Sequence, residues 1–390
     1  MTHIALVSPE DQRVTFVELF FDLVFVFSVT QVVTYLAHHL TWVGLGQAIL
    51  VFWLVWWAWT QFTWALNAAN TEHPGVELCT LGTTGIAFLM AVSLPEAFGG
   101  RALWFAVPYV LVRVLGLVIY ARVAQANAPT HHAAVLRFAF PSTAGLAAVL
   151  LGAFVGGPAQ YWLWLLTIVL DVIAAAIGGG AEDWNIHPEH FVERHGLFVI
   201  IALGETLIVA AAGLTTPDWS PQLAEVAVLA VALSCALWWS YFTGPKTALE
   251  HGLAATSPSR RGAMARDAFS LLHFPMLCGI IGFAVAVEAA VAEPSTPFPT
   301  GARLALAASV VLFVGGTALA VRTCGGRLLG SRLFVGGLGA AALLGPWGLS
   351  PAGALAIALA SVAVIVLVEG RRGSHAGESA QTRAPQHASD

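Results

Sequence analysis

The chain has 390 residues, of which 58% are hydrophobic and only 10% are charged, and its mean hydropathy is +0.78. Soluble domains carry about 25% charged residues, so this composition excludes an ordinary soluble protein and predicts an all-α integral membrane protein. The formal net charge of −5 offers no basic field of the kind that nucleic-acid binding requires.

Apolar segments long enough to cross a bilayer, about 20 residues each, recur along the chain. Clusters of Gly and Pro separate them, such as His73-Pro74-Gly75. The pattern predicts about twelve transmembrane helices, at residues 15–38, 44–67, 76–95, 102–122, 132–155, 159–179, 190–213, 222–243, 267–291, 302–321, 328–346 and 349–369.

Lysine and arginine are distributed unevenly over the predicted loops. Of the 17 Lys and Arg residues, Arg101 and Arg303 fall in loops on one side, and Arg113 and Arg137 fall within spans. All the others fall on the side that holds both termini, and the positive-inside rule places that side in the cytoplasm. The N-terminus lacks the apolar run and cleavage site of a signal peptide, so we expect the first span to direct insertion itself.

The seventh predicted span resembles the first. FVERHGLFVIIALGE, from residue 191, aligns without a gap with FVELFFDLVFVFSVT, from residue 16. Glu193 then pairs with Glu18, and Glu205 pairs with Thr30. Because each half has an even number of spans, both insert the same way up. We expect two parallel six-helix repeats, with boundaries at residues 1–14 (cytoplasmic N-terminus), 15–179 (first half), 180–370 (second half) and 371–390 (disordered cytoplasmic tail).

Two acids lie in the first predicted span. Glu18 and Asp22 are four residues apart and therefore share one face of a helix. Charge at membrane depth is costly and marks function by default, so such a pair can relay protons or coordinate a cation. The alternative is structural, with Glu18 complementing the helix dipole and Asp22 paired with an arginine.

The seventh span carries Arg194 and Glu205, which share a face but lie about 16 Å apart along a helix. Each therefore needs another partner. Glu205 is far from both ends of its span and is the foremost candidate for an ion path, with a fixed salt bridge as the alternative. Arg113 in the fourth span is the candidate partner for an acid, because arginine keeps its charge when buried. Asp171 in the sixth span is a further buried acid.

The stretch before and within the start of the seventh span is rich in His and Glu. His187, His190, Glu193 and His195 fit no metal-binding spacing, and the His-Glu-x-x-His zinc signature is absent. We expect no metal or cofactor there, and a pH-responsive or interfacial cluster instead, because histidine titrates near neutrality. A metal site is the alternative.

The second span presents an aromatic and polar stripe at roughly helical spacing: Trp53, Trp56, Thr60, Trp64 and Asn67. Such a stripe is typical of packing or of an interfacial belt, and an aromatic ligand pocket is the alternative. The sequence contains no phosphate-binding loop, dinucleotide fingerprint or nucleophile elbow. ATP-driven transport by this chain alone is therefore not expected. We also expect that the protein is not an enzyme.

Four stretches together resemble the bacterial low temperature requirement protein A (LtrA) family: VELFFDLVFVFSVTQ (17–31), WWAWTQFTWALN (56–67), SLPEAFGGR (93–101) and HFVERHGLFVIIALGE (190–205). The resemblance covers the first two-thirds of the chain. It implies a polytopic protein of the bacterial inner membrane, named for a requirement in growth at low temperature, and it implies no reaction. The signature positions that it implies, without individual roles, are Glu18, Asp22, Pro95, Glu96, Glu193, Arg194, His195, Gly204 and Glu205.

Three classes of function remain open. The first is a cation- or proton-coupled transporter or channel, with ionisable groups along its path and arginines as balancing charges: Glu205, Asp22, Glu18, Asp171, Glu193, His195, Arg194 and Arg113. The second is an intramembrane enzyme acting on a lipid or isoprenoid substrate, in which Glu18, Asp22 and residues 193–195 do acid–base work. The third is a structural membrane component needed in the cold. The expected partners are membrane lipids and a small cation, a proton or a lipid, and the sequence leaves the oligomeric state open.

Overall fold

The computed structural model describes residues 5–9, 11–127, 129–179, 186–215, 219–327 and 329–381, and for residues 127, 129–134, 179 and 371–381 it describes the backbone alone. The described chain is built of helices and loops. Its one β contact is an isolated antiparallel bridge between Val7 and Ala69. The all-α class predicted from the composition is confirmed.

The helices follow one another with short connections. Their bounds are α1 (Phe16–His38), α2 (Trp42–Ala68), α3 (Pro74–Ser93), the 3₁₀ turn η1 (Leu94–Glu96), α4 (Ala102–Asn127), α5 (Pro129–Val155), α6 (Gly157–Gly179), α7 (Pro188–Leu214), α8 (Pro221–Phe242), α9 (Pro245–Ala255), α10 (Pro258–Ala265), the π-helical turn η2 (Arg266–Leu271), α11 (His273–Ala292), α12 (Thr300–Thr323), α13 (Gly330–Leu344) and α14 (Pro351–Gln381).

In the described part of the chain, 11 helical segments are long and apolar enough to cross a membrane. The predicted span at residues 328–346 corresponds to α13, which has only 15 residues and is shorter than the roughly 20 that a bilayer requires. Eleven of the twelve predicted spans thus correspond to full-length apolar segments, and the remaining one corresponds to the shorter apolar helix α13. α9 and α10 lie in a predicted loop, and each begins with a proline in its first turn, where proline is tolerated.

The last helix is longer than expected. α14 runs to Gln381, so helical backbone continues past residue 371, where the sequence analysis placed the start of a disordered tail. The final residues of that predicted tail lie outside the described part of the chain.

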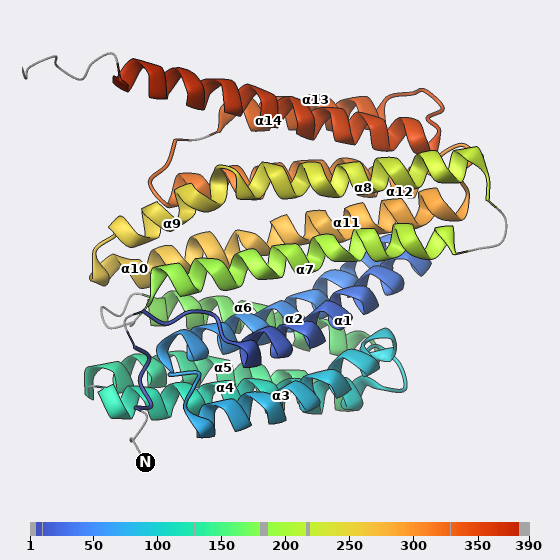
Figure 1. Ribbon diagram of the computed structural model, residues 1–390. Coiled ribbons are helices and arrows are strands. Elements are labelled where there is room, and N and C mark those ends of the chain that lie inside the picture. The colour runs from blue at the N-terminus through green and yellow to red at the C-terminus, as the bar shows by residue number, and fades with distance from the viewer. Residues whose placement is uncertain are drawn as a thin grey trace, which may run out of the picture.

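The helices run side by side along a common direction, with α1–α6 on one side and α7–α14 on the other (Figure 1). Where the two groups meet, α1 and α2 pack against α7 and α11. The start of α1 and the end of α14 lie at the same end of the bundle.

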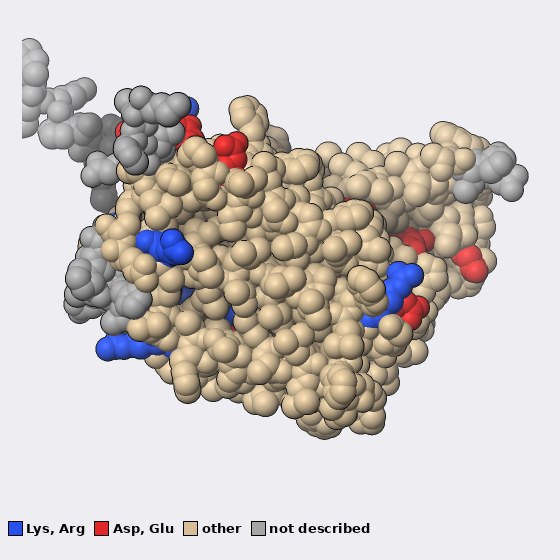
Figure 2. Space-filling view, turned by 90° about the horizontal axis from the view of Figure 1, so that it is seen from below, with Lys and Arg blue, Asp and Glu red and all other residues tan. Residues whose placement is uncertain are grey.

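One face of the molecule shows how the charges are distributed along the helices. In Figure 2, acidic and basic residues gather toward the two ends of the bundle, and a broad band of uncharged residues lies between them. Large apolar side chains are exposed on these helices, for example Trp104 at 67% and Phe140 at 83%. An exposed apolar band between charged ends is the surface that a bilayer covers.

Helices α11 and α12 pack closely through a glycine. A Cβ added at Gly279 would lie 2.8 Å from the backbone nitrogen of Phe313 and 2.9 Å from the carbonyl oxygen of Ser309. Small residues at such contacts allow membrane helices to approach. The absence of a side chain at Gly279 therefore sets the distance between the two helices.

Replacing Gly279 with Ala should lower the free energy of unfolding by about 1–3 kcal/mol, because the backbone of α12 must move away. Thermal unfolding of the purified protein in detergent, followed by tryptophan fluorescence, measures this loss. The matched control is Gly315→Ala on α12, where nothing lies within 4 Å of the added Cβ. Equal stability of the two variants would contradict the packing argument.

Candidate functional site

Four ionisable side chains meet between α1 and α7. Glu18 and Asp22 come from one face of α1, and His190 and Arg194, also four residues apart, come from one face of α7. Arg194 donates through Nη1 to Glu18 Oε1 at 2.5 Å and through Nη2 to Asp22 Oδ1 at 2.7 Å. His190 Nε2 lies 3.1 Å from Glu18 Oε1. All four are buried, with at most 1% exposure, and we call them the charge cluster.

Neutral groups complete the surroundings of the two carboxylates. The backbone N–H and the hydroxyl of Thr15 both donate to Glu18 Oε2 at 3.0 Å, and the bond from the backbone N–H is part of the capping box that starts α1. The indole N–H of Trp59 on α2 donates to Asp22 Oδ1 at 2.8 Å. Three of the four carboxylate oxygens thus accept hydrogen bonds. The fourth, Asp22 Oδ2, is buried and accepts none from the described residues.

The N-terminal segment and the end of α2 cover the charge cluster. The side chain of Asn67 bonds the backbone of His187, accepting from its N–H at 3.0 Å and donating to its carbonyl oxygen at 3.1 Å. Its Nδ2 also lies 2.9 Å from His190 Nδ1. The Ser8 hydroxyl lies 2.6 Å from His187 Nε2, and the Gln12 side chain donates to the carbonyl oxygen of Leu66. These bonds tie the N-terminal segment and the start of α7 to the end of α2 beside the cluster.

Arg113 and Asp171 form a separate buried ion pair. Arg113 Nη2 donates to Asp171 Oδ1 at 2.9 Å and Nη1 donates to Oδ2 at 3.3 Å, with both side chains fully buried. Arg113 also donates from Nη1 to the Tyr109 hydroxyl and from Nε to the side-chain oxygen of Gln61. The acid that Arg113 binds is thus Asp171, within the first half of the chain, and the charge cluster has Arg194 instead.

Glu205 stands apart from both arginines. Its Oε2 accepts a hydrogen bond of 2.5 Å from the hydroxyl of Thr30 on α1, and it takes part in none of the ion pairs between described residues. The residue is 1% exposed. Thr30 and Glu205 are 175 residues apart and are the positions that the alignment of the two halves places opposite each other.

The other candidates of the 187–195 stretch divide between the surface and the core. Glu193 is exposed. His195 is buried, its Nδ1 bonds the carbonyl oxygen of Phe191 at 2.8 Å, and its ring packs against Trp59 with 5.1 Å between centroids. Within the described residues, no three His, Cys, Asp or Glu side chains are placed to hold a metal ion.

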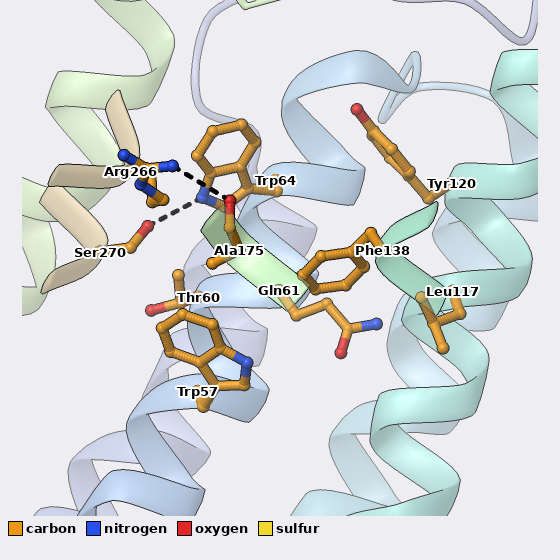
Figure 3. Close-up of a pocket in the computed structure, with 10 residues that line it drawn as sticks. All are labelled: Trp57, Thr60, Gln61, Trp64, Leu117, Tyr120, Phe138, Ala175, Arg266 and Ser270. Atoms are coloured by element: carbon orange, nitrogen blue, oxygen red, sulfur yellow. Dashed lines mark hydrogen bonds between the residues drawn. The ribbon is translucent and has the colours of Figure 1, made fainter. Parts of the chain in front are cut away.

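An aromatic pocket lies between α2, α4, α5, α6 and η2 (Figure 3). Its volume is about 40 Å³, and α2 contributes Trp57 and Trp64 to its wall. Of the three tryptophans expected at such a pocket, Trp64 lines it, whereas Trp53 and Trp56 do not. The indole of Trp56 donates instead to the carbonyl oxygen of Ser270. The pocket contains none of the carboxylates.

Sequence reasoning missed Trp59, which binds Asp22. Trp59 follows Trp56 by three residues, and residues three apart are neighbours on a helix surface. The spacing therefore could have placed Trp59 beside the aromatic stripe. Among the other signature positions, Pro95 and Glu96 are exposed in η1 and Gly204 is partly exposed in α7. None of these three belongs to the charge cluster.

Residues 13–368 match the family of the bacterial low temperature requirement A protein (LtrA). The chain belongs to the LtrA family. This confirms the resemblance seen in the four motifs, and it extends the family likeness through the last third of the chain. Together with the apolar helices, LtrA membership shows a polytopic membrane protein.

One curated relative is similar along most of its length. The uncharacterized protein RA0937 of Rhizobium meliloti (strain 1021) is 28% identical over 323 residues, which cover 80% of this LtrA chain and 77% of the relative. No solved structure matches the chain.

Proposed function

We propose that this LtrA protein is a proton-coupled transporter of the bacterial cytoplasmic membrane and that the charge cluster is its proton-binding site. The observation that carries the proposal is that two buried carboxylates, Glu18 and Asp22, share the single guanidinium of Arg194. An uncompensated negative charge in a low-dielectric interior is costly, and protonation of one carboxyl group removes it. Asp22 Oδ2, which accepts no hydrogen bond, is the oxygen free to carry that proton.

The geometry favours a proton over a metal cation. Hard cations need several oxygen ligands around them. Here Glu18 Oε1, Glu18 Oε2 and Asp22 Oδ1 already accept hydrogen bonds from N–H or O–H donors. A single free oxygen can bind a proton but cannot replace the hydration shell of a cation.

A path for the proton runs along α1. Thr15 is partly exposed and its hydroxyl reaches Glu18, so the cluster communicates with the end of the bundle that the Lys and Arg distribution assigns to the cytoplasm. Thr30 lies about 12 Å beyond Asp22 along α1, and its hydroxyl bonds Glu205 on α7. The buried side chain of Phe25 lies on α1 between the position of Asp22 and that of Thr30. An apolar layer between two acidic sites is suited to a gated transporter, in which a conformational change passes the proton onward.

The relation between the halves supports a site shared by two parallel repeats. In the first half α1 packs against α3, and in the second half α7 packs against α11. In each half the partner is the second long helix after the first one. Under a two-fold relation, equivalent positions meet only at the axis. Thr30 and Glu205, which are equivalent in the alignment, are joined by a hydrogen bond, so we place the axis near this contact and the proton path beside it.

The proposal is tested by proton flux in proteoliposomes that contain a pH-sensitive dye. We expect wild-type protein to dissipate an imposed pH gradient, and Asp22→Asn and Glu205→Gln to fall to the rate of protein-free liposomes, because neither amide can exchange a proton. Glu193→Gln on α7 is the matched control, since it neutralises an exposed acid next to Arg194, and it should retain the wild-type rate.

Two results would decide against transport. Well-folded wild-type protein without proton flux would point to the structural role or to the enzyme on a lipid or isoprenoid substrate, and lipid that co-purifies with the protein would separate these. Full flux in Asp22→Asn would remove the charge cluster from the path.

A further inference from the structure

The protonation state of His190 decides how much charge the cluster holds. With His190 neutral, Glu18, Asp22 and Arg194 leave one negative charge in excess. With His190 as an imidazolium ion, the four charges cancel, and a carboxyl group has no reason to hold a proton. His190 Nε2 lies at Glu18. The side chain next to the other ring nitrogen, Nδ1, therefore determines whether His190 carries a positive charge.

That side chain is Asn67, and the backbone fixes its orientation. The His187 N–H, which can only donate, lies 3.0 Å from Asn67 Oδ1, and the His187 carbonyl oxygen, which can only accept, lies 3.1 Å from Nδ2. Turning the amide over would break both bonds. Asn67 therefore presents its N–H₂ group, a donor, to His190.

It follows that His190 Nδ1 accepts. Asn67 Nδ2 lies 2.9 Å from it, so Nδ1 must carry a lone pair, and the single ring proton resides on Nε2. Nε2 faces the carboxylate of Glu18, 3.1 Å from Oε1 and 3.3 Å from Oε2, where an N–H is the matching donor. Both nitrogens of the ring, which is fully buried, are thus satisfied by the neutral imidazole.

We propose that Asn67 is a positioning residue that holds His190 in the neutral, Nε2-protonated tautomer and thereby directs the proton of the cluster to the carboxylates. The assignment of the tautomer stands on geometry alone, and its consequence for the carboxylates rests on the proposed function. The charged and titratable groups described around His190 are Glu18 on α1 and, on α7, Arg194 one turn along and His187 one turn back. From the N-terminal segment, the hydroxyl of Ser8 lies 2.6 Å from His187 Nε2.

The first measurement is the ¹⁵N spectrum of histidine-labelled protein in lipid, with the His190 signals assigned by their loss in His190→Gln. Near neutral pH, wild-type His190 should show one protonated and one unprotonated ring nitrogen, with the proton on Nε2. In Asn67→Asp the carboxylate faces Nδ1, and His190 should become an imidazolium ion. Asn67→Ala frees the His187 carbonyl oxygen to accept from Nδ1 and should have the same effect.

The second measurement is the infrared carbonyl band of a protonated carboxyl group, identified by its loss in Asp22→Asn. Asn67→Ala should remove this band, because His190 takes the proton instead. Asn70→Ala is the matched control. Asn70 also lies near the end of α2, but its side chain accepts from the backbone N–H of Glu72 and should leave both the ring tautomer and the carbonyl band unchanged.

The outcomes separate the two proposals. An imidazolium at His190 in wild-type protein, or a neutral His190 in folded Asn67→Asp and Asn67→Ala, overturns the role of Asn67. A neutral, Nε2-protonated His190 without any protonated carboxyl band upholds the tautomer assignment and overturns proton binding by the cluster. The wild-type spectra decide the tautomer of His190 and the presence of a protonated carboxyl group, and the folded Asn67 variants decide the role of Asn67.

Discussion

Replacing Arg194 with Gln should lower the free energy of unfolding by about 3–5 kcal/mol, which is the range for breaking a buried ion pair by removal of one partner. The substitution leaves Glu18 and Asp22 buried with no positive charge in contact. Thermal unfolding in detergent, together with the yield of monodisperse protein, measures the loss.

Two further variants show whether charge is the cause. Adding Asp22→Asn to Arg194→Gln removes one of the orphaned carboxylates and should restore part of the stability. Arg322→Gln, at the exposed end of α12, should stay within about 0.5 kcal/mol of wild type, as surface substitutions do. An Arg194→Gln protein as stable as wild type would show that water reaches the cluster.

Breaking the Arg113–Asp171 pair from one side should be equally severe. Arg113→Met leaves Asp171 fully buried without a counter-ion, and we expect a loss of about 3–5 kcal/mol. The double variant Arg113→Met with Asp171→Leu should recover most of this loss, because apolar residues of similar volume often replace a buried ion pair without penalty. Tyr109 and Gln61 each lose a partner, so recovery should be incomplete.

Flux through the same double variant tests the role of the pair. We expect it to keep wild-type proton flux in liposomes, because Asp171 lies in a closed pair with no contact to the charge cluster. Loss of flux in a well-folded double variant would return Asp171 to the ion path, where the sequence analysis placed it.

The class of this protein could be predicted from the sequence because hydropathy acts locally. A run of about 20 apolar residues must form a helix in a bilayer, since its backbone can be satisfied only within itself. The starts of α3, α7 and α8 were predictable to within a few residues because prolines stand in the first turns of these helices. The same local rule overestimated the length of α13, because the apolar run continues beyond the end of the helix into Gly345, Pro346 and Trp347.

Part of the charge cluster was also readable from the sequence. The spacing of Glu18 and Asp22, and that of His190 and Arg194, follows from 3.6 residues per turn and places each pair on one face of its helix. The LtrA resemblance marked Glu18, Asp22 and Arg194 as positions of interest without saying what they touch.

Only the tertiary structure decided the partners. Periodicity fixes which residues share a face but not which neighbour that face meets, because this depends on how each helix is rotated and packed. Arg194 therefore reaches Glu18 and Asp22 across 176 and 172 residues of sequence, and Arg113 reaches Asp171. Asn67, which by sequence is one polar member of an aromatic stripe, lies 2.9 Å from Nδ1 of His190.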